Sequence, residues 1–266
     1  MAAHRIVFAN EKGGSGKSTS AVHVAIALAA MGRKVAALDL DTRQRTLGRY
    51  LDNRAATITR EGGALPTALY ETFDPAKSGP IEERLAALAE DHDFLVIDTP
   101  GRDDEHVRTA ISSADTLVTP INDSFVDLDL IGQVDADNYK VKRPSFYAEL
   151  VWDARKARGK RDGATVDWVV LRNRLQHLEA RNMRRVAAAL GELSKRVGFR
   201  IIPGLSERVI YRELFPKGLT LLDLAAIGKE AGLGHVAARG ELRELVAGLQ
   251  LPNAKAPAAA RAEENA

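Results

Sequence analysis

The feature that most constrains the fold is the segment N-E-K-G-G-S-G-K-S-T at residues 10–19. An apolar run, R-I-V-F-A, precedes it, and an apolar-periodic segment, S-A-V-H-V-A-I-A-L-A-A-M, follows it. A glycine-rich loop between a strand and a helix surrounds a phosphate with backbone N–H groups and the positive end of the helix. This order of segments therefore predicts a P-loop.

Short apolar runs alternate with helical patterns along most of the chain. Alternating elements with strands rich in Val, Ile and Leu predict an α/β fold: a mostly parallel, doubly wound sheet flanked by helices. Gly32 is expected to close the first helix as a C-cap. The predicted strands lie near residues 5–10, 34–40, 93–98, 115–120, 166–172 and 198–202, and the helical patterns include 17–31, 81–90, 104–112, 179–197 and 237–250.

No internal repeat and no change of composition divides the chain, so residues 1–251 are expected to form one P-loop domain. The tail, residues 252–266, lacks apolar periodicity and is expected to be disordered. We see no signal peptide and no apolar run long enough to span a bilayer, and we expect a cytoplasmic protein. The chain has no Cys, which excludes Cys-based zinc and iron–sulfur sites and thiol nucleophiles.

The residues of the P-loop have distinct predicted roles. Backbone N–H groups of residues 13–18 would point at the phosphates, and Lys17 would reach the β- and γ-phosphates. Ser18 would ligate Mg²⁺, and Thr19 is placed for the α-phosphate. The predicted phosphate-binding residues are Gly13, Gly14, Ser15, Gly16, Lys17, Ser18 and Thr19.

Two further segments end predicted strands with carboxylates. A-A-L-D-L-D-T-R-Q-R places Asp39 and Asp41 at a strand's carboxyl end, where open α/β sheets bind ligands. F-L-V-I-D-T-P-G ends in Asp98, which is typical of a Walker B carboxylate that holds Mg²⁺ through water. Gly101 would then sense the γ-phosphate through its backbone, as a switch loop does. A strand-end Asp is also common as a helix cap, but all three segments in the expected order make coincidence a poor explanation.

The loop contains a second lysine, Lys12, and Glu11 stands where the usual motif has Gly. The sequence K-G-G-S-G-K-S resembles the deviant Walker A motif of the ParA/MinD family of ATPases. That resemblance implies ATP as the nucleotide and makes Lys12 a catalytic residue that crosses a dimer interface to the partner's ATP. It also implies that Asp41 orients or activates the attacking water. By family position Asn173 would contact adenine, whereas from sequence alone a turn Asn is an equal alternative.

The predicted helix at 179–197 separates an apolar face from a basic one at roughly 100° per residue. Residues 151–215 contain 15 Lys and Arg against 7 Asp and Glu, a net charge of +8 in a chain of net charge +2. One interpretation is a solvated surface helix, and the other is sequence-independent contact with double-stranded DNA. The predicted DNA-binding residues are Arg181, Arg184, Arg185, Lys195, Arg196 and Arg200, with Arg208 and Arg212 as extensions that depend on the fold.

A second basic run, A-R-K-A-R-G-K-R-D-G at residues 154–163, is predicted to be a mobile surface loop. It would either assist DNA binding or have no role.

Within the ParA/MinD family, several stretches resemble the MipZ branch, whose members position the division plane. They extend to about residue 224, and the resemblance weakens around 52–90 and beyond 224. The Ala-rich tail disfavours the membrane-binding helix of MinD-type relatives, and the early P-loop leaves no room for an N-terminal DNA-binding domain. The stretches that resemble the MipZ branch are D-L-D-T-R-Q-R-T, P-I-N-D-S-F-V-D-L-D, D-W-V-V-L-R-N-R-L, K-R-V-G-F-R and R-V-I-Y-R-E-L-F-P-K-G-L-T-L-L-D-L.

The resemblance implies a homodimer in the ATP state, with a ParB-like protein, FtsZ and double-stranded DNA as partners. It also implies slow ATP hydrolysis with Mg²⁺ and a bacterial location at the nucleoid and the origin or pole. The alternative is a ParA-type partition ATPase that moves a DNA cargo. A P-loop metabolic kinase is a third possibility, which the second lysine disfavours.

Overall fold

The computed structural model describes residues 2–61, 64–122, 125–135, 141–173, 180–224 and 233–252. Most of the tail that the sequence predicts to be disordered, residues 253–266, lies outside this part of the chain. In the part that the structure describes, no helix is long and apolar enough to cross a membrane.

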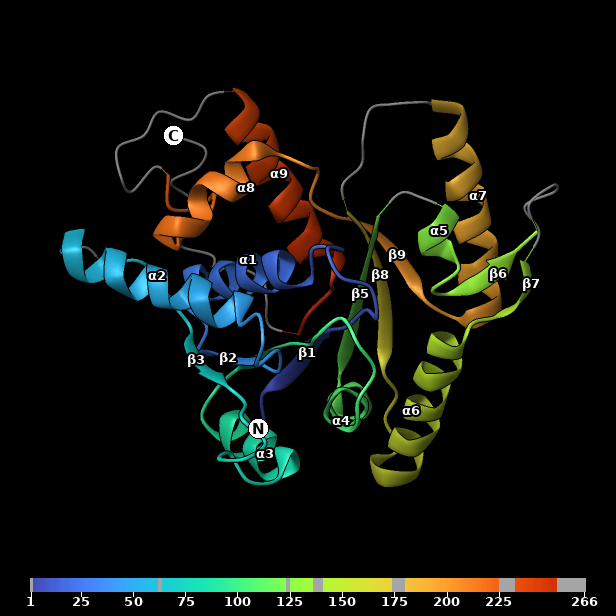
Figure 1. The fold of residues 1–266 in the computed structure, drawn as a ribbon, viewed down its shortest axis with the longest axis horizontal. Coiled ribbons are helices and arrows are strands. Elements are labelled where there is room, and N and C mark those ends of the chain that lie inside the picture. The colour runs from blue at the N-terminus through green and yellow to red at the C-terminus, as the bar shows by residue number, and fades with distance from the viewer. Residues whose placement is uncertain are drawn as a thin grey trace.

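The centre of the molecule is a parallel sheet of seven strands in the order β3-β2-β4-β1-β5-β8-β9 (Figure 1). All its paired neighbours run parallel, which confirms the predicted α/β class. The strands are β1 (His4–Phe8), β2 (Val35–Asp39), β3 (Leu69–Thr72), β4 (Phe94–Asp98), β5 (Thr116–Asn122), β8 (Asp167–Asn173) and β9 (Arg200–Pro203).

Helices cover both faces of the sheet (Figure 1). On one face α1 (Lys17–Ala30), α2 (Thr46–Glu61) and α9 (Leu233–Gly248) pack against Phe8, Ala37 and Val96. On the other face α3 (Ile81–Glu90), α4 (Glu105–Ser113), α6 (Phe146–Asp162) and α7 (Ala180–Val197) pack against alternate strand residues such as Val7 and Ile97. Strands β2 and β4 are buried along their whole length, because successive side chains enter opposite layers of the core.

Five shorter elements complete the part of the fold that the structure describes. The short helix α5 (Phe125–Leu128) and a two-stranded antiparallel ribbon, β6 (Gly132–Val134) and β7 (Val141–Pro144), follow β5. Helix α8 (Val209–Leu214) and the 3-10 turn η1 (Phe215–Lys217) connect β9 to the last part of the chain.

The prediction of a mobile loop at 154–163 is wrong, because this run forms the second half of α6. Ser145 caps the start of the helix by accepting from the N–H of Ala148, and Gly163 ends it in the left-handed conformation. Ala, Arg and Lys are good helix formers, so charge alone did not justify a loop. Arg158 is buried against Asp115, and Arg155 donates to the carbonyls of Val166 and Gly198.

The sequence also missed α2 and β3. Helix α2 is polar for most of its length, and β3 is a half-exposed edge strand, L-Y-E-T, without an apolar run. The pairing register aligns the ends of the three central strands. Phe8 lies beside Asp98, and Asp39 lies beside Asp98 on the other side, so three strands end at one level.

Candidate nucleotide-binding site

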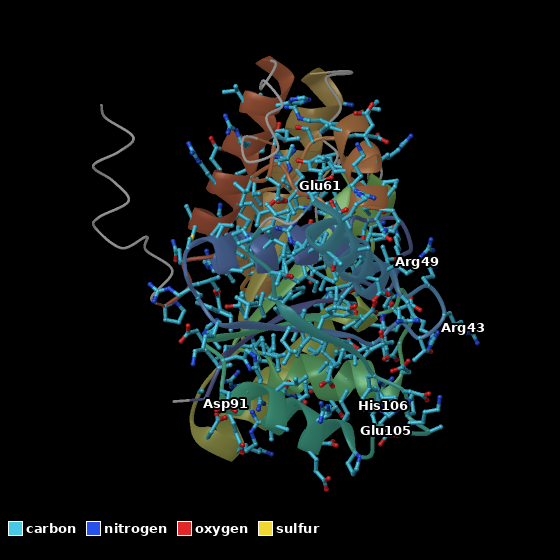
Figure 2. The ribbon with its side chains drawn as sticks, turned by 90° about the vertical axis from the view of Figure 1, so that its left-hand side faces the viewer. Arg43, Arg49, Glu61, Asp91, Glu105 and His106 are labelled. Carbon is cyan, nitrogen blue, oxygen red and sulfur yellow. The ribbon has the colours of Figure 1, made fainter. Side chains whose placement is uncertain are left out.

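A cavity of about 420 Å³ lies where β1, β2 and β4 end. We call it the phosphate cavity. Figure 2 shows Arg43, from the loop after β2, at the edge of the molecule on the same side as Arg49, Glu105 and His106. Sequence reasoning did not single out Arg43 or Arg102 as residues of this cavity. The lining residues are Gly13, Gly14, Gly16, Lys17, Ser18, Thr19, Asp41, Arg43, Gln44, Thr46, Thr99, Pro100, Gly101 and Arg102.

The P-loop is a tight turn that two glycines make possible. Gly14 has φ 76° and Gly16 has φ 90°, in the left-handed region that other residues rarely adopt. A Cβ on Gly16 would lie 2.6 Å from Nδ2 of Asn173, so this position has no room for a side chain. Gly16 then caps α1, whose free N–H groups lie beside the cavity.

Lys17 is only 7% exposed, and its ammonium donates to the carbonyl of Lys12 at 2.9 Å. Burial lowers the pKa of Lys17, and the nearby carboxylates of Asp98 and Asp41 oppose that shift. A desolvated cation in contact with a backbone carbonyl attracts an anion more strongly than a solvated one does. Lys17 is thus well placed to bind phosphate.

Asp98 ends β4, and its side chain is 1% exposed. In the described part of the chain neither of its oxygens has a well-formed hydrogen bond, although Ser18 is near enough to lower its pKa. Burial and the carboxylate of Asp39 outweigh Ser18 and Lys17 and raise the pKa of Asp98 to about 8. Unused carboxylate oxygens beside a serine hydroxyl are a suitable donor set for Mg²⁺. The residues present therefore fit a magnesium nucleotide.

The two aspartates after β2 have separate positions. Asp39 is buried, and its oxygens accept from the N–H groups of Asp41 at 2.9 Å and Gly48 at 3.0 Å, so it holds the start of α2 to the strand end. Burial is the main cause that raises its pKa. Asp41 lines the phosphate cavity, and its Oδ1 accepts from the N–H groups of Arg43 and Gln44. Of the pair, only Asp41 can reach a bound phosphate or water.

Gly101 lies against the P-loop backbone. A Cβ on Gly101 would be 3.1 Å from the nitrogen of Gly13 and 3.3 Å from the carbonyl carbon of Lys12. This close approach requires glycine and brings the loop after β4 to the wall of the cavity. Its role as a γ-phosphate sensor stays a prediction.

Lys12 points away from Lys17. Its ammonium forms an ion pair with Asp127 of α5 at 3.0 Å, and its side chain is 36% exposed. Asp127 also accepts from the N–H of Asn122, so its carboxylate is fixed at the end of β5. Lys12 is not among the residues that line the phosphate cavity of its own chain.

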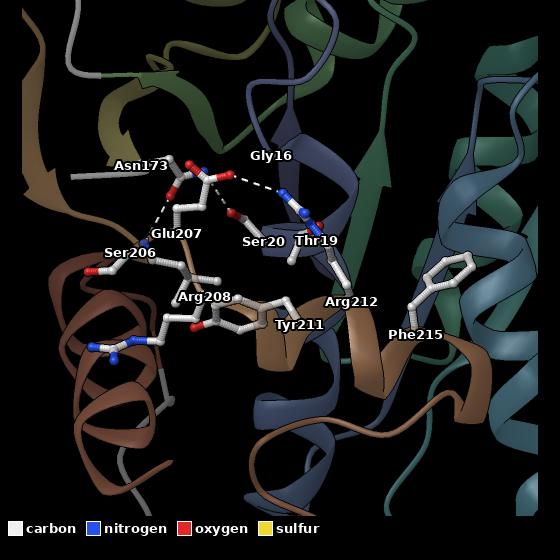
Figure 3. A pocket seen from close by; sticks show the side chains of 11 residues that line it. Gly16, Thr19, Ser20, Asn173, Ser206, Glu207, Arg208, Tyr211, Arg212 and Phe215 are labelled. Atoms are coloured by element: carbon white, nitrogen blue, oxygen red, sulfur yellow. Dashed lines mark hydrogen bonds and ion pairs between the residues drawn. The ribbon is translucent and has the colours of Figure 1, made fainter. Parts of the chain in front are cut away.

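A second cavity, of about 300 Å³, opens beside the first (Figure 3). We call it the side cavity. Gly16 and Thr19 line both cavities. The side cavity has apolar walls from Leu205, Tyr211 and Phe215, which sequence reasoning missed. An apolar pocket with a few polar groups suits a nucleotide base.

Asn173 lies at the junction of these cavities, but its amide is already used. Its Nδ2 donates to the carbonyl of Ser15 at 3.0 Å and to the hydroxyl of Ser20 at 3.2 Å, and its Oδ1 accepts from the N–H of Leu205 at 2.9 Å. Asn173 therefore ties the P-loop and α1 to the loop after β9. Contact with adenine stays a prediction.

The structure confirms that α7 has a buried apolar face, with Val186, Leu190 and Leu193 in the core. The side chains of Arg181 and Arg184 lie outside the described residues. On the rest of the helix Lys195 and Arg196 are exposed, Arg185 is half-buried, and Lys195 donates to Glu192.

Arg200 lies apart from the other predicted DNA-binding residues. It forms a two-pronged ion pair with Asp167 of β8 and donates to the carbonyl of Gly248. A structural role accounts for these contacts. Arg208 pairs with Glu241 of α9 in a similar way.

Comparison with known proteins gives three kinds of match. A family model described as ATPase MipZ matches residues 4–253. An ATP-binding protein of Methanocaldococcus jannaschii is 33% identical over 137 residues, which is 44% of this chain and 52% of that protein. The septum site-determining protein MinD of Helicobacter pylori is 30% identical over 164 residues, 52% of this chain and 61% of MinD. The chain thus spans about half the length of the curated relatives it matches.

Among solved structures, an Asp-to-Ala variant of Cyanothece McdA in complex with ATP superposes with a TM-score of 0.62 at 17% identity. The match covers 94% of this chain and 98% of McdA. At this identity the similarity shows the fold alone.

Proposed function

Since the chain belongs to the MipZ family of ATPases, we propose that it is an ATP-dependent dimerisation switch that hydrolyses ATP slowly. Its ATP-bound dimer would bind DNA without sequence preference and inhibit FtsZ assembly, and a ParB-like protein would recruit the monomer. These activities would place the protein in the bacterial cytoplasm, at the nucleoid and the origin or pole. One ParA-like domain over residues 1–251 would carry them.

The observation that carries the proposal is the different placement of two lysines in one loop. Lys17 lies in the phosphate cavity, whereas Lys12 is outside it and half-exposed, held by Asp127. A cation that does not reach its own cavity is available to a second copy once that ion pair opens. A fixed cation near the transferring phosphoryl group stabilises its developing charge, as arginine fingers do.

The remaining residues have roles that follow from their positions. Lys17 would bind the β- and γ-phosphates, Thr19 the α-phosphate, and Ser18 with Asp98 would hold Mg²⁺. When bound, Mg²⁺ would neutralise charge on the phosphates. Asp41 would position the attacking water, because it is the strand-end carboxylate that faces the cavity. Gly101 would respond to the γ-phosphate through its backbone.

The experiment that tests the output follows FtsZ assembly by light scattering with the Asp41→Ala protein in ATP or ADP. Suppression in ATP only, with no suppression by Lys17→Ala, would support a division inhibitor whose active form is the ATP state. Normal assembly in the presence of an ATP-bound dimer that binds DNA would contradict that output.

The second candidate function is partition of a DNA cargo, as in the ParA branch. The exposed basic residues of α7 favour it as much as they favour division-site positioning, because both need retention on DNA. The ParB-like partner separates the two functions. A partition ATPase would show a marked rise in ATP turnover when ParB is added, whereas a positioning switch would mainly be recruited.

A further inference from the structure

An ion pair lies at the edge of the side cavity. Arg212 of α8 donates to the carboxylate of Glu207 at 3.1 Å, and both residues line the cavity together with Gly16 and Thr19. Figure 3 shows the Arg212 guanidinium meeting Glu207 near Thr19 and Gly16 rather than pointing away from the cavity. Arg212 is 77% exposed and Glu207 38%, so the pair is loosely held.

The two cavities fix which part of a nucleotide would pass this ion pair. Gly16 and Thr19 line both cavities, with Lys17 and Ser18 on the phosphate side and Tyr211 and Phe215 on the other. A nucleotide with its phosphates at the P-loop and its base in the side cavity must cross Gly16 and Thr19 with its α-phosphate and ribose. Of the phosphates of such a nucleotide, the α-phosphate is thus the nearest to Arg212.

The chemistry beside Gly16 and Thr19 favours a change of partner for Arg212, from the Glu207 carboxylate to a phosphate. A guanidinium binds phosphate and carboxylate oxygens with the same planar geometry. A bound nucleotide brings several negative charges close to Glu207, which repels them unless a cation lies between. An exposed ion pair contributes about 0–1 kcal/mol, so it opens at little cost.

We propose that Arg212 is a nucleotide-binding residue that leaves Glu207 for the α-phosphate when a nucleotide binds, and that Glu207 restrains it in the free protein. The proposal rests on the proposed nucleotide site. It gives α8, which sequence reasoning left without a role beyond a basic extension, a direct part in nucleotide affinity. Because ATP and ADP share the α-phosphate, Arg212 would not distinguish them.

The test measures the affinity of the full chain for unlabelled MgATP and MgADP by isothermal titration calorimetry. Arg212→Ala is expected to weaken both nucleotides by about tenfold and to equal degrees, with Arg212→Lys in between. Glu207→Gln is expected to tighten both by about two- to fivefold, because Arg212 is then released. Arg60→Ala, an exposed arginine at the end of α2, is the matched control and is expected to change neither affinity.

The opposite signs are the decisive feature. If the ion pair only stiffened the loop after β9, Arg212→Ala and Glu207→Gln would weaken affinity alike, and that result would overturn the proposal. An unchanged affinity in Arg212→Ala, with a normal melting curve by circular dichroism, would overturn it as well. A wild-type chain that binds neither nucleotide would instead remove the proposed nucleotide site itself.

Discussion

Lys17 in the phosphate cavity is 7% exposed and the nearby Asp98 is 1% exposed, whereas Lys195 and Arg196 on α7 are exposed to solvent. Lys17 is held by the carbonyl of Lys12, and burial shifts the pKa values of both Lys17 and Asp98. On α7 the ion pair between Lys195 and Glu192 joins neighbouring turns of one helix and is exposed on both sides. The difference separates a site that binds one ligand in one geometry from a surface that can attract any polyanion.

This contrast predicts that a single change disables the cavity. Lys17→Ala is expected to reduce ATP affinity by at least about 100-fold, because it removes the buried cation nearest the phosphates. Titration calorimetry with MgATP measures the loss. Binding within threefold of the wild type would mean that the backbone of the P-loop alone holds the phosphates.

Asp41→Ala is expected to lower ATP turnover by about 100-fold while ATP still binds, since Asp41 faces the cavity but does not hold the P-loop. Phosphate release and size-exclusion chromatography in ATP measure turnover and the trapped dimer. Asp41 also supports the turn at Arg43 and Gln44, so a melting curve is the control. A monomer that hydrolyses ATP at the normal rate would contradict the role of Asp41.

The Lys12–Asp127 ion pair holds the lysine that we propose acts on the ATP of a second copy. Lys12→Ala is expected to lower turnover by about tenfold or more without loss of nucleotide affinity in the monomer, because Lys12 lies outside its own cavity. Phosphate release at increasing protein concentration measures the effect. Turnover that depends on concentration in the same way as in the wild type would remove the assignment in trans.

Charge reversals on the basic face of α7 are expected to weaken DNA binding gradually, whereas a single change disables the phosphate cavity. Reversing Arg185 and Arg196 to Glu should weaken DNA binding by about tenfold and lower its dependence on salt, because each phosphate contact releases counterions. Fluorescence anisotropy with a labelled duplex at several salt concentrations measures both quantities. The matched control reverses Arg60 and Lys77, two exposed basic residues far in sequence from the basic segment, so that the net charge changes by the same amount. Equal loss in both proteins would mean that net charge, not this face, binds DNA.

The same contrast explains what could be predicted from the sequence. The P-loop, Asp41 and Asp98 could be placed because strand ends and glycine turns put them at one edge of a parallel sheet. The side cavity could not, since Tyr211 and Arg212 come from the short helix α8 and Phe215 from the 3-10 turn after it, and this stretch carries a family resemblance but no ligand-binding pattern. The loop predicted at 154–163 was wrong because Arg155 and Arg158 bind backbone carbonyls and Asp115. These partners lie far away in the sequence, so the basic run alone does not show them.

The smallest predicted effect concerns stability. Burial raises the pKa of Asp98 to about 8, whereas an unfolded chain ionises an Asp near about 4. The folded protein therefore binds more protons than the unfolded chain between these values, so this carboxyl lowers stability as pH rises from about 4 to about 8. The comparison is made by urea denaturation without nucleotide or Mg²⁺. The free energy of unfolding of Asp98→Asn is expected to exceed that of the wild type by about 1–3 kcal/mol at pH 8, and this difference is expected to disappear near pH 5.

Glu192→Gln on α7 is the matched control for this prediction, because the Glu192 carboxylate is 61% exposed. Its free energy of unfolding is expected to stay within about 0.5 kcal/mol of the wild type at every pH. If Asp98→Asn behaves like Glu192→Gln at pH 8, the buried carboxylate has no stability cost. The carboxylates of Asp98 and Glu192 would then have the same effect on stability, and the cavity would differ from the α7 face only in shape. If the two variants diverge as expected, the Asp98 carboxylate is kept at the expense of the free protein's stability, which is the cost expected of a site built to bind a cation.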